Sequence, residues 1–203
     1  MALSGWRRRR ESPPWSSVVY WVIDLETTGL DERTDAIVSV GMVPIRDGVI
    51  QYGQRFASLV QPPAARAAGG VGIHHILPSE VAGAPPLADV VSEIDRRLRE
   101  GVAVMHHAAF DVGFLTRAYR DTGRAWPRVR VIDTLDLLVR LHRTRHRFTP
   151  YPPALASSLT DARRELGLPP HDAHRALDDA VATAELFLAL RSRLGVCTLR
   201  GLG

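Results

Sequence analysis

The chain has 203 residues, of which 45% are hydrophobic and 24% charged; this ordinary globular composition excludes a fibrous repeat and a wholly disordered chain. Its single cysteine excludes an internal disulfide bond, and its longest strongly apolar run, Val18–Ile23, is too short to span a bilayer. The formal net charge of +4 comes from residues 1–10, which hold four arginines and no acid, so the rest of the chain is neutral.

Residues 1–16 show no apolar periodicity and contain a pair of prolines, so we expect a disordered basic arm. No apolar segment follows the arginines, which argues against an export signal and makes the cytoplasm the expected location. One folded domain is expected over residues 17–194, followed by a short C-terminal tail at 195–203.

The first half of the folded part reads as strands. Val18–Leu25 is a β-branched and aromatic run, typical of a strand buried on both faces. Ala36–Ile45 and Val49–Leu59 are two further strand-like runs. They are joined by Arg46-Asp47-Gly48, and Asp-Gly between such runs predicts a hairpin.

The second half alternates helices and strands. Pro86–Glu100 has apolar residues at helical spacing, and Val102–Met105 is a short buried strand. The remaining expected elements are a helix at 108–119, a strand at 130–132 and helices at 134–142, 155–166 and 173–194. This order predicts an α/β fold with a mixed sheet.

Two carboxylates stand at the end of the first strand, before the turn Thr27-Thr28-Gly29. Because side chains two apart on a strand project to the same face, Asp24 and Glu26 emerge together. Like charges this close repel each other unless a cation neutralises them, and hard oxygen ligands suit Mg²⁺ or Mn²⁺. The pair therefore indicates a metal site at the carboxyl end of a strand.

Two further acids could belong to such a site, but neither indicates it by itself. Asp111 follows the strand Val102–Met105 and reads equally well as a first-turn acid that interacts with a helix dipole. Asp179 lies five residues after His174, so the two would point about 140° apart within one helix. If His174 precedes the helix, it can lie above the site while Asp179 points inward. Asp178 is the rival acid.

Taken together, three motifs resemble those of the DEDDh family of 3′–5′ exonucleases: VIDLETTGLD, HHAAFDVGFL and HDAHRALDDAVATAELFLAL. The resemblance covers residues 18 to about 190 and is strongest to the branch of the proofreading epsilon subunit of bacterial DNA polymerase III and its stand-alone relatives. The segment Ile73-His74-His75-Ile76 is also similar to the family's connecting region.

The resemblance implies an RNase H-like exonuclease domain over 17–194, with a five-stranded mixed sheet flanked by helices. It also implies two divalent cations, Mg²⁺ or Mn²⁺. Asp24 would bridge both ions, Glu26 and Asp179 would complete the shell of one, and Asp111 would support the second. His174 would be the general base, and the family's spacing of five from this His selects Asp179 over Asp178.

The resemblance also implies contacts with the substrate. Thr27 and Thr28 would meet the terminal 3′-hydroxyl, and His74 and Phe110 would line the pocket for the last nucleotide. The family usually has Asn where this chain has His107, which could fill that polar role.

The implied reaction is release of nucleoside monophosphates from single-stranded or frayed DNA 3′ ends. Two alternatives stay open: the same chemistry on RNA ends, as in oligoribonuclease-like or tRNA-trimming branches, and a non-catalytic module that binds nucleic acid or a polymerase. The second is disfavoured because a binder does not need four mutually repelling acids. A DNA polymerase is a candidate partner, although a tail of about ten residues leaves little room for a polymerase-binding segment.

Residues 117–147 carry nine arginines against Asp121, Asp133 and Asp136. Arginines that neutralise phosphates provide affinity that is independent of sequence and sensitive to salt. We therefore expect this basic stretch to guide the strand upstream of the site.

Overall fold

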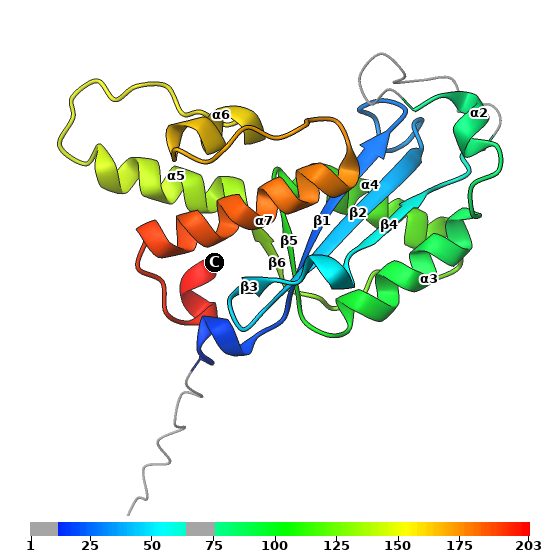
Figure 1. Ribbon diagram of the computed structural model, residues 1–203, viewed down its shortest axis with the longest axis horizontal. Coiled ribbons are helices and arrows are strands. Elements are labelled where there is room, and N and C mark those ends of the chain that lie inside the picture. The colour runs from blue at the N-terminus through cyan, green and yellow to red at the C-terminus, as the bar shows by residue number, and fades with distance from the viewer. Residues whose placement is uncertain (1–11, 64–75) are drawn as a thin grey trace, which may run out of the picture.

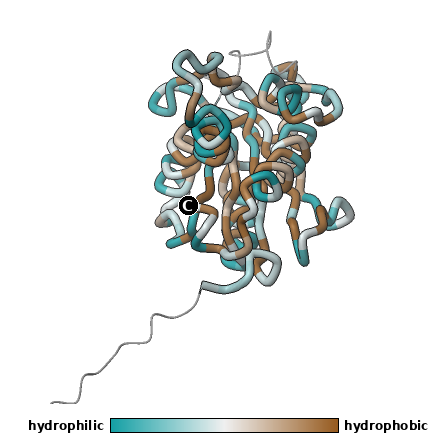
Figure 2. The backbone as a smooth tube through the Cα atoms, turned by 90° about the vertical axis from the view of Figure 1, so that its left-hand side faces the viewer, coloured by the Kyte–Doolittle hydropathy of each residue, from teal (hydrophilic) through white to brown (hydrophobic). Residues whose placement is uncertain are grey.

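A computed structural model of the chain describes residues 12–63 and 76–203 (Figure 1). A mixed sheet lies at its centre, with helices on both faces (Figures 1 and 2). This α/β architecture confirms the predicted fold class. No helix within these two ranges has the length and apolar character needed to cross a membrane.

The sheet has strand order β3-β2-β1-β5-β6, and β4 also pairs with β2. The central strand β1 is antiparallel to β2 and parallel to β5, which in turn runs parallel to β6. The strands are β1 Tyr20–Thr27, β2 Ile37–Arg46, β3 Val49–Ile50, β4 Phe56–Leu59, β5 Val102–Met105 and β6 Val131–Asp133.

The sheet has six strands in the described residues, rather than five, because the third expected strand is broken. The 3₁₀ helix η2, Tyr52–Gln54, divides Val49–Leu59 into β3 and β4, both of which pair with β2. The predicted hairpin turn is confirmed: Asp47 and Gly48 both have positive φ, at 52° and 78°. Such a turn matches the twist of the strands that it joins.

Two layers of helices cover the sheet. The helices α3 and α4 pack on one face, and α5, α6 and α7 on the other (Figure 1). The α-helices are α2 Pro78–Val81, α3 Leu87–Leu98, α4 Ala108–Asp121, α5 Thr134–Arg145, α6 Leu159–Glu165 and α7 Ala176–Arg193. Two of them begin later than expected: Ser158 caps α6, and α7 begins at Ala176, which leaves His174 in the preceding loop.

The alternation of side chains along β1 separates two hydrophobic cores. Tyr20 and Val22 pack in the core under α5, α6 and α7, whereas Trp21, Ile23 and Leu25 pack against α3 and α4. Figure 2 shows hydrophobic residues concentrated in the strands and hydrophilic ones in outer segments. Asp24 and Glu26 continue the Tyr20 and Val22 series, so they share the face that α7 covers.

The two ends of the described chain pack against each other. The Trp15 N–H donates to the Cys197 carbonyl and the Leu199 N–H to the Pro13 carbonyl. In the same C-terminal segment, the side chains of Val196 and Leu202 are buried. Residues 12–16 of the expected arm thus pack against the expected tail, and residues 1–11 lie outside the described residues.

Gly41 allows α7 to lie directly on the sheet. Gly41 pairs with Asp24 across β1 and β2 and faces the same helix layer. A Cβ atom at this position would overlap the backbone carbonyl of Ala176 in the first turn of α7. This close approach brings the beginning of α7 beside Asp24.

We predict that Gly41→Ala lowers the free energy of unfolding by about 2 kcal/mol or more, because backbone must move to admit the methyl group. Urea unfolding measures the loss. Gly83→Ala is the matched control, since an added Cβ there meets nothing within 4 Å. Equal stability of the two variants would contradict the proposed tight packing.

Candidate active site

Three carboxylates meet where the end of β1 lies under the start of α7. Asp24 and Glu26 come from β1, and Asp179 from the first turn of α7. Their ligand atoms all lie within 4.8 Å of one another. Glu26 and Asp179 are buried and Asp24 is partly buried. The structure thus brings together three of the four acids expected to bind metal.

The electrostatics of this group fit a bound cation. Burial, together with the nearby Asp179, raises the pKa of Glu26 to about 7. Burial also raises the pKa of Asp24 well above its ordinary value, with further contributions from Asp111, Asp179 and Glu26. Carboxylates held close in this way are stabilised by a divalent ion, and an all-oxygen donor set suits Mg²⁺ or Mn²⁺.

Asp111 borders the group from the other side. It is buried in the first turn of α4 and lies outside the set of three, but its charge contributes to the raised pKa of Asp24. Burial is the main cause of its own raised pKa, and Asp133 and Glu26 add to it. Hydrogen bonds from the backbone N–H groups of Asp111 and Leu25 oppose the shift.

Asp133, which sequence reasoning did not select, fixes the helix that carries Asp111. Its Oδ1 accepts hydrogen bonds from the N–H groups of His107 at 3.0 Å and Leu135 at 2.8 Å. Its Oδ2 accepts from the Ala108 N–H at 2.8 Å. One carboxylate thus joins the N-termini of α4 and α5. The sequence could have indicated Asp133, because it ends a strand that runs parallel to β5, and sites form at the carboxyl ends of such strands.

His107 adopts the left-handed conformation, with φ of 60°, at the N-cap of α4. Asn and His both tolerate this region better than most residues, which gives a backbone reason for the exchange. The Nε2 atoms of His107 and His106 lie 2.9 Å and 2.8 Å from the Ser157 carbonyl oxygen. The side chain of His107 therefore contacts the segment before α6.

Two histidines approach Asp179. The backbone N–H of His174 donates to Asp179 Oδ2 at 2.8 Å, and the His174 side chain is exposed in the loop before α7. The Nε2 atom of His171 lies 2.8 Å from Asp179 Oδ1. His171 was not expected from the sequence, because only the folded loop brings it there. The rival acid Asp178 instead pairs with Arg175.

A buried arginine holds this loop in place. Arg163 is 3% exposed and donates hydrogen bonds to the carbonyl oxygens of Ala182 at 2.6 Å and Pro169 at 2.8 Å. It also forms an ion pair with Glu185 at 2.7 Å. These contacts fasten α6 and the start of the loop to α7, two residues before His171.

The residues expected to contact the terminal nucleotide differ in their hydrogen bonds and burial. The Thr28 hydroxyl accepts from the Ala36 N–H and donates to Asp35, and the Thr27 hydroxyl donates to the Gly29 carbonyl. Both hydroxyls therefore stabilise the turn after β1. Phe110 is partly buried, with its ring 4.9 Å from that of Phe114. His74 lies outside the described residues.

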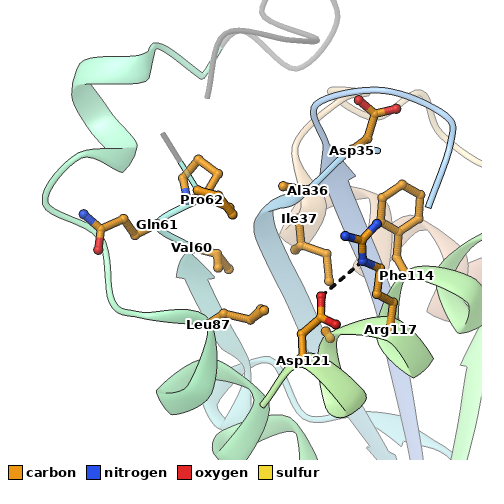
Figure 3. Close-up of a pocket in the computed structure, with 12 residues that line it drawn as sticks. Asp35, Ala36, Ile37, Val60, Gln61, Pro62, Leu87, Phe114, Arg117 and Asp121 are labelled. Carbon is orange, nitrogen blue, oxygen red and sulfur yellow. Dashed lines mark hydrogen bonds and ion pairs between the residues drawn. The ribbon is translucent and has the colours of Figure 1, made fainter. Parts of the chain in front are cut away.

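A small cavity lies near this turn, between β2, β4, α3 and α4 (Figure 3). Its apolar lining includes Ile37, Val60 and Phe114, and the ion pair between Arg117 and Asp121 lies beside it (Figure 3). Its volume of about 50 Å³ admits a few water molecules. A cavity of this volume does not hold a whole nucleotide.

The exonuclease family model matches residues 21–187. The chain is 32% identical over 168 residues to a PolC-type DNA polymerase III of Clostridium perfringens, covering 83% of this chain but 11% of that protein. It is 31% identical over 176 residues to a DNA polymerase III subunit epsilon of Treponema pallidum, covering 85% of this chain and 76% of that protein.

Among solved structures, the chain resembles E. coli exonuclease I in complex with a dT13 oligonucleotide, with a TM-score of 0.73 and 17% identity over 88% of this chain and 42% of that one. This likeness supports the fold. Together with the matched relatives, it confirms the resemblance that the three motifs predicted, at the level of an epsilon-like exonuclease.

The raised pKa values predict a pH-dependent stability in EDTA. A carboxyl with a raised pKa binds its proton more tightly in the folded protein than in the unfolded chain. For Glu26, stability therefore falls as pH rises from about 4.5 to about 7 and then levels off, a loss on the order of 3 kcal/mol. Mg²⁺ restores stability above pH 7. Thermal melting at pH 5 to 8 measures both effects; equal melting temperatures in EDTA and Mg²⁺ at pH 8 would contradict the metal site.

The positions of Asp178 and Asp179 predict opposite outcomes for two similar variants. Asp179→Asn removes a carboxylate from the group of three and should abolish most of the rise in melting temperature that Mg²⁺ produces at pH 8. Asp178→Asn is the matched control and should keep the full response, because Asp178 lies outside that group. Melting curves with and without Mg²⁺ decide; an unchanged response in Asp179→Asn would exclude Asp179 as a ligand.

Proposed function

Because the chain belongs to the exonuclease family, we propose that it is a divalent-metal-dependent 3′–5′ exonuclease that releases nucleoside monophosphates from single-stranded or frayed DNA ends. One observation carries the proposal: Asp24, Glu26 and Asp179 converge within 4.8 Å. Asp111 stands next to them, and all four are acids. This set supports hydrolysis of a phosphodiester in which metal ions balance the negative charge of the substrate.

The proposed ions are two Mg²⁺ or Mn²⁺. Asp24, Glu26 and Asp179 would hold one, and Asp24 and Asp111 the other. When bound, they supply Lewis acidity to the phosphate oxygens, stabilise the leaving oxygen and lower the pKa of water. The first turns of α4 and α7 also adjoin the site, and the partial positive charge of helix N-termini favours an anionic substrate there.

His174 is proposed as the general base. Its side chain is exposed, and its backbone N–H donates to Asp179, which supports a position next to the carboxylate group. An imidazole titrates near neutral pH and can accept the proton of an attacking water. His171 has a different role in this proposal, because its ring already contacts Asp179 and orients that carboxylate.

The terminal nucleotide would contact the turn after β1 and the start of α4. Phe110 is the candidate for stacking on the last base, since its ring is only partly buried. Thr27 and Thr28 would shape the turn that meets the 3′-hydroxyl, because their own hydroxyls are engaged within it. His107 and His74 remain predicted contacts.

DNA is favoured as the substrate, because the matched relatives are named as DNA polymerase III proteins and the E. coli exonuclease I structure contains a DNA oligonucleotide. For the same reason, a DNA polymerase is a proposed partner. The chain spans only 11–14% of the PolC-type relatives, so their other activities are not carried over.

The direct test is degradation of a 5′-labelled single-stranded DNA oligonucleotide and its RNA twin with Mg²⁺, Mn²⁺ or EDTA. We expect a ladder that shortens from the 3′ end of the DNA and is lost in EDTA and in Asp24→Ala. His174→Ala should slow cleavage by about 10²- to 10⁴-fold, the usual contribution of a general base. Asp178→Asn serves as the control that retains activity.

Three outcomes would redirect the proposal. Faster loss of the RNA would make it an RNA exonuclease. Cleavage of circular single-stranded DNA, which has no end, would indicate an endonuclease. Release of no nucleotide by folded, metal-loaded protein would favour a binding module.

A further inference from the structure

Two aromatic rings stand in the solvent on the loop between α5 and α6. Phe148 and Tyr151 are 89% and 93% exposed, more than any other large hydrophobic side chain in the described residues. We call residues 147–153 the aromatic loop. It leaves the C-terminal end of α5 and is drawn in yellow in Figure 1. Neighbouring exposed rings on a small domain mark a contact surface.

Positive charge adjoins these rings. The Arg147 guanidinium lies 5.3 Å from the centroid of the Phe148 ring. Arg140, Arg143 and Arg147 line one depression along α5, in which Asp136 is the acid. Neither Arg143 nor Arg147 forms an ion pair with any residue in 12–63 or 76–203. Both are therefore available to a negatively charged partner.

The basic surface is narrower than the predicted stretch at 117–147. Several arginines of that stretch instead hold the fold together. Arg117 donates to the Glu32 carbonyl, Arg124 to the Ser92 hydroxyl and Arg130 to the Gly203 carbonyl. The uncompensated charge therefore gathers at the end of α5, beside the aromatic loop.

The segment that carries the aromatic loop is attached to the candidate active site. Its far end, Ser157, is held by His106 and His107, and His107 caps the helix that carries Asp111. The near end is reached along α5, whose N-cap is Asp133, close to Asp111. Twelve helical residues span about 18 Å. A single strand covers that length with at most about five nucleotides of 3.4 Å each.

We propose that the aromatic loop and Arg143 bind the single strand a few nucleotides upstream of its 3′ end. Bases stack on Phe148 and Tyr151, and phosphates contact Arg143 and Arg147. Rings interleaved with unpaired arginines favour nucleic acid over a protein partner, because stacking and phosphate contacts together bind any sequence. This inference rests on the proposed exonuclease function, which it deepens by giving a binding surface to the strand behind the scissile bond.

The test compares a long and a short substrate. Phe148→Ala combined with Tyr151→Ala should lower kcat/KM for a 15-nucleotide single-stranded DNA at least about tenfold, because two stacking contacts are lost. A dinucleotide is too short to reach the loop, even with its strand extended, so its kcat/KM should change less than about twofold. Arg143→Ala combined with Arg147→Ala should reduce the slope of log kcat/KM against log salt by up to about two for the 15-mer.

The control removes another exposed apolar side chain, at the end of the sheet away from the carboxylates. Val49 is 57% exposed on β3 and pairs with Arg46 of β2, near the start of β1. Val49→Ala should leave both substrates unaffected. Loop variants that do not alter 15-mer cleavage, or that reduce cleavage of both substrates equally, overturn the inference.

A second measurement separates this inference from the proposed function. Fluorescence anisotropy of the labelled 15-mer in an Asp24→Ala background with Mg²⁺ reports binding without requiring cleavage. Binding that weakens about tenfold in the loop variant supports the surface, even if the wild-type protein cleaves neither substrate and the proposed function fails. Unchanged binding overturns the surface, even if cleavage proceeds, and would leave the rings to a protein partner.

Discussion

The contact between Gly41 and the first turn of α7 is the constraint on which the candidate site depends. Only a residue without a side chain at this point of β2 lets the helix backbone touch the sheet. Because Gly41 lies opposite Asp24, the same contact sets Asp179 over the end of β1. The geometry of a group of charged oxygens is thus fixed by an uncharged backbone contact.

That geometry is electrostatically unfavourable for the isolated protein. Burial and mutual repulsion raise the pKa values of Asp24, Glu26 and Asp111 together. Contacts elsewhere compensate: two hydrophobic cores hold the sheet between its helices, while Asp133 and Arg163 fasten the segments that carry Asp111 and His171. The repelling carboxylates thus lower the stability of the fold, and the surrounding contacts raise it again, as is usual where function requires groups that repel each other.

The sequence predicted what depends on local pattern. The strand before Asp24 and the hairpin at Asp47 follow from periodicity and turn chemistry, whereas the family follows from the resemblance of the three motifs. It did not predict what depends on distant parts of the chain. The contact of His171 with Asp179 needs the loop held by Arg163, and the split of the third strand at Tyr52–Gln54 depends on how that segment pairs with β2. The roles of Thr27, Thr28 and His107 at a nucleotide stay predictions.

The pairing of Trp15 with Cys197 has a consequence for how such a domain can be used. It closes the described chain into a near loop at the beginning of β1, whereas the carboxylates lie at the opposite end of that strand (Figure 1). A domain whose ends meet away from its working surface can be inserted into a larger polypeptide or circularly permuted with little disturbance. The same architecture thus suits an autonomous unit and a module within a much longer chain, as in the PolC-type relatives.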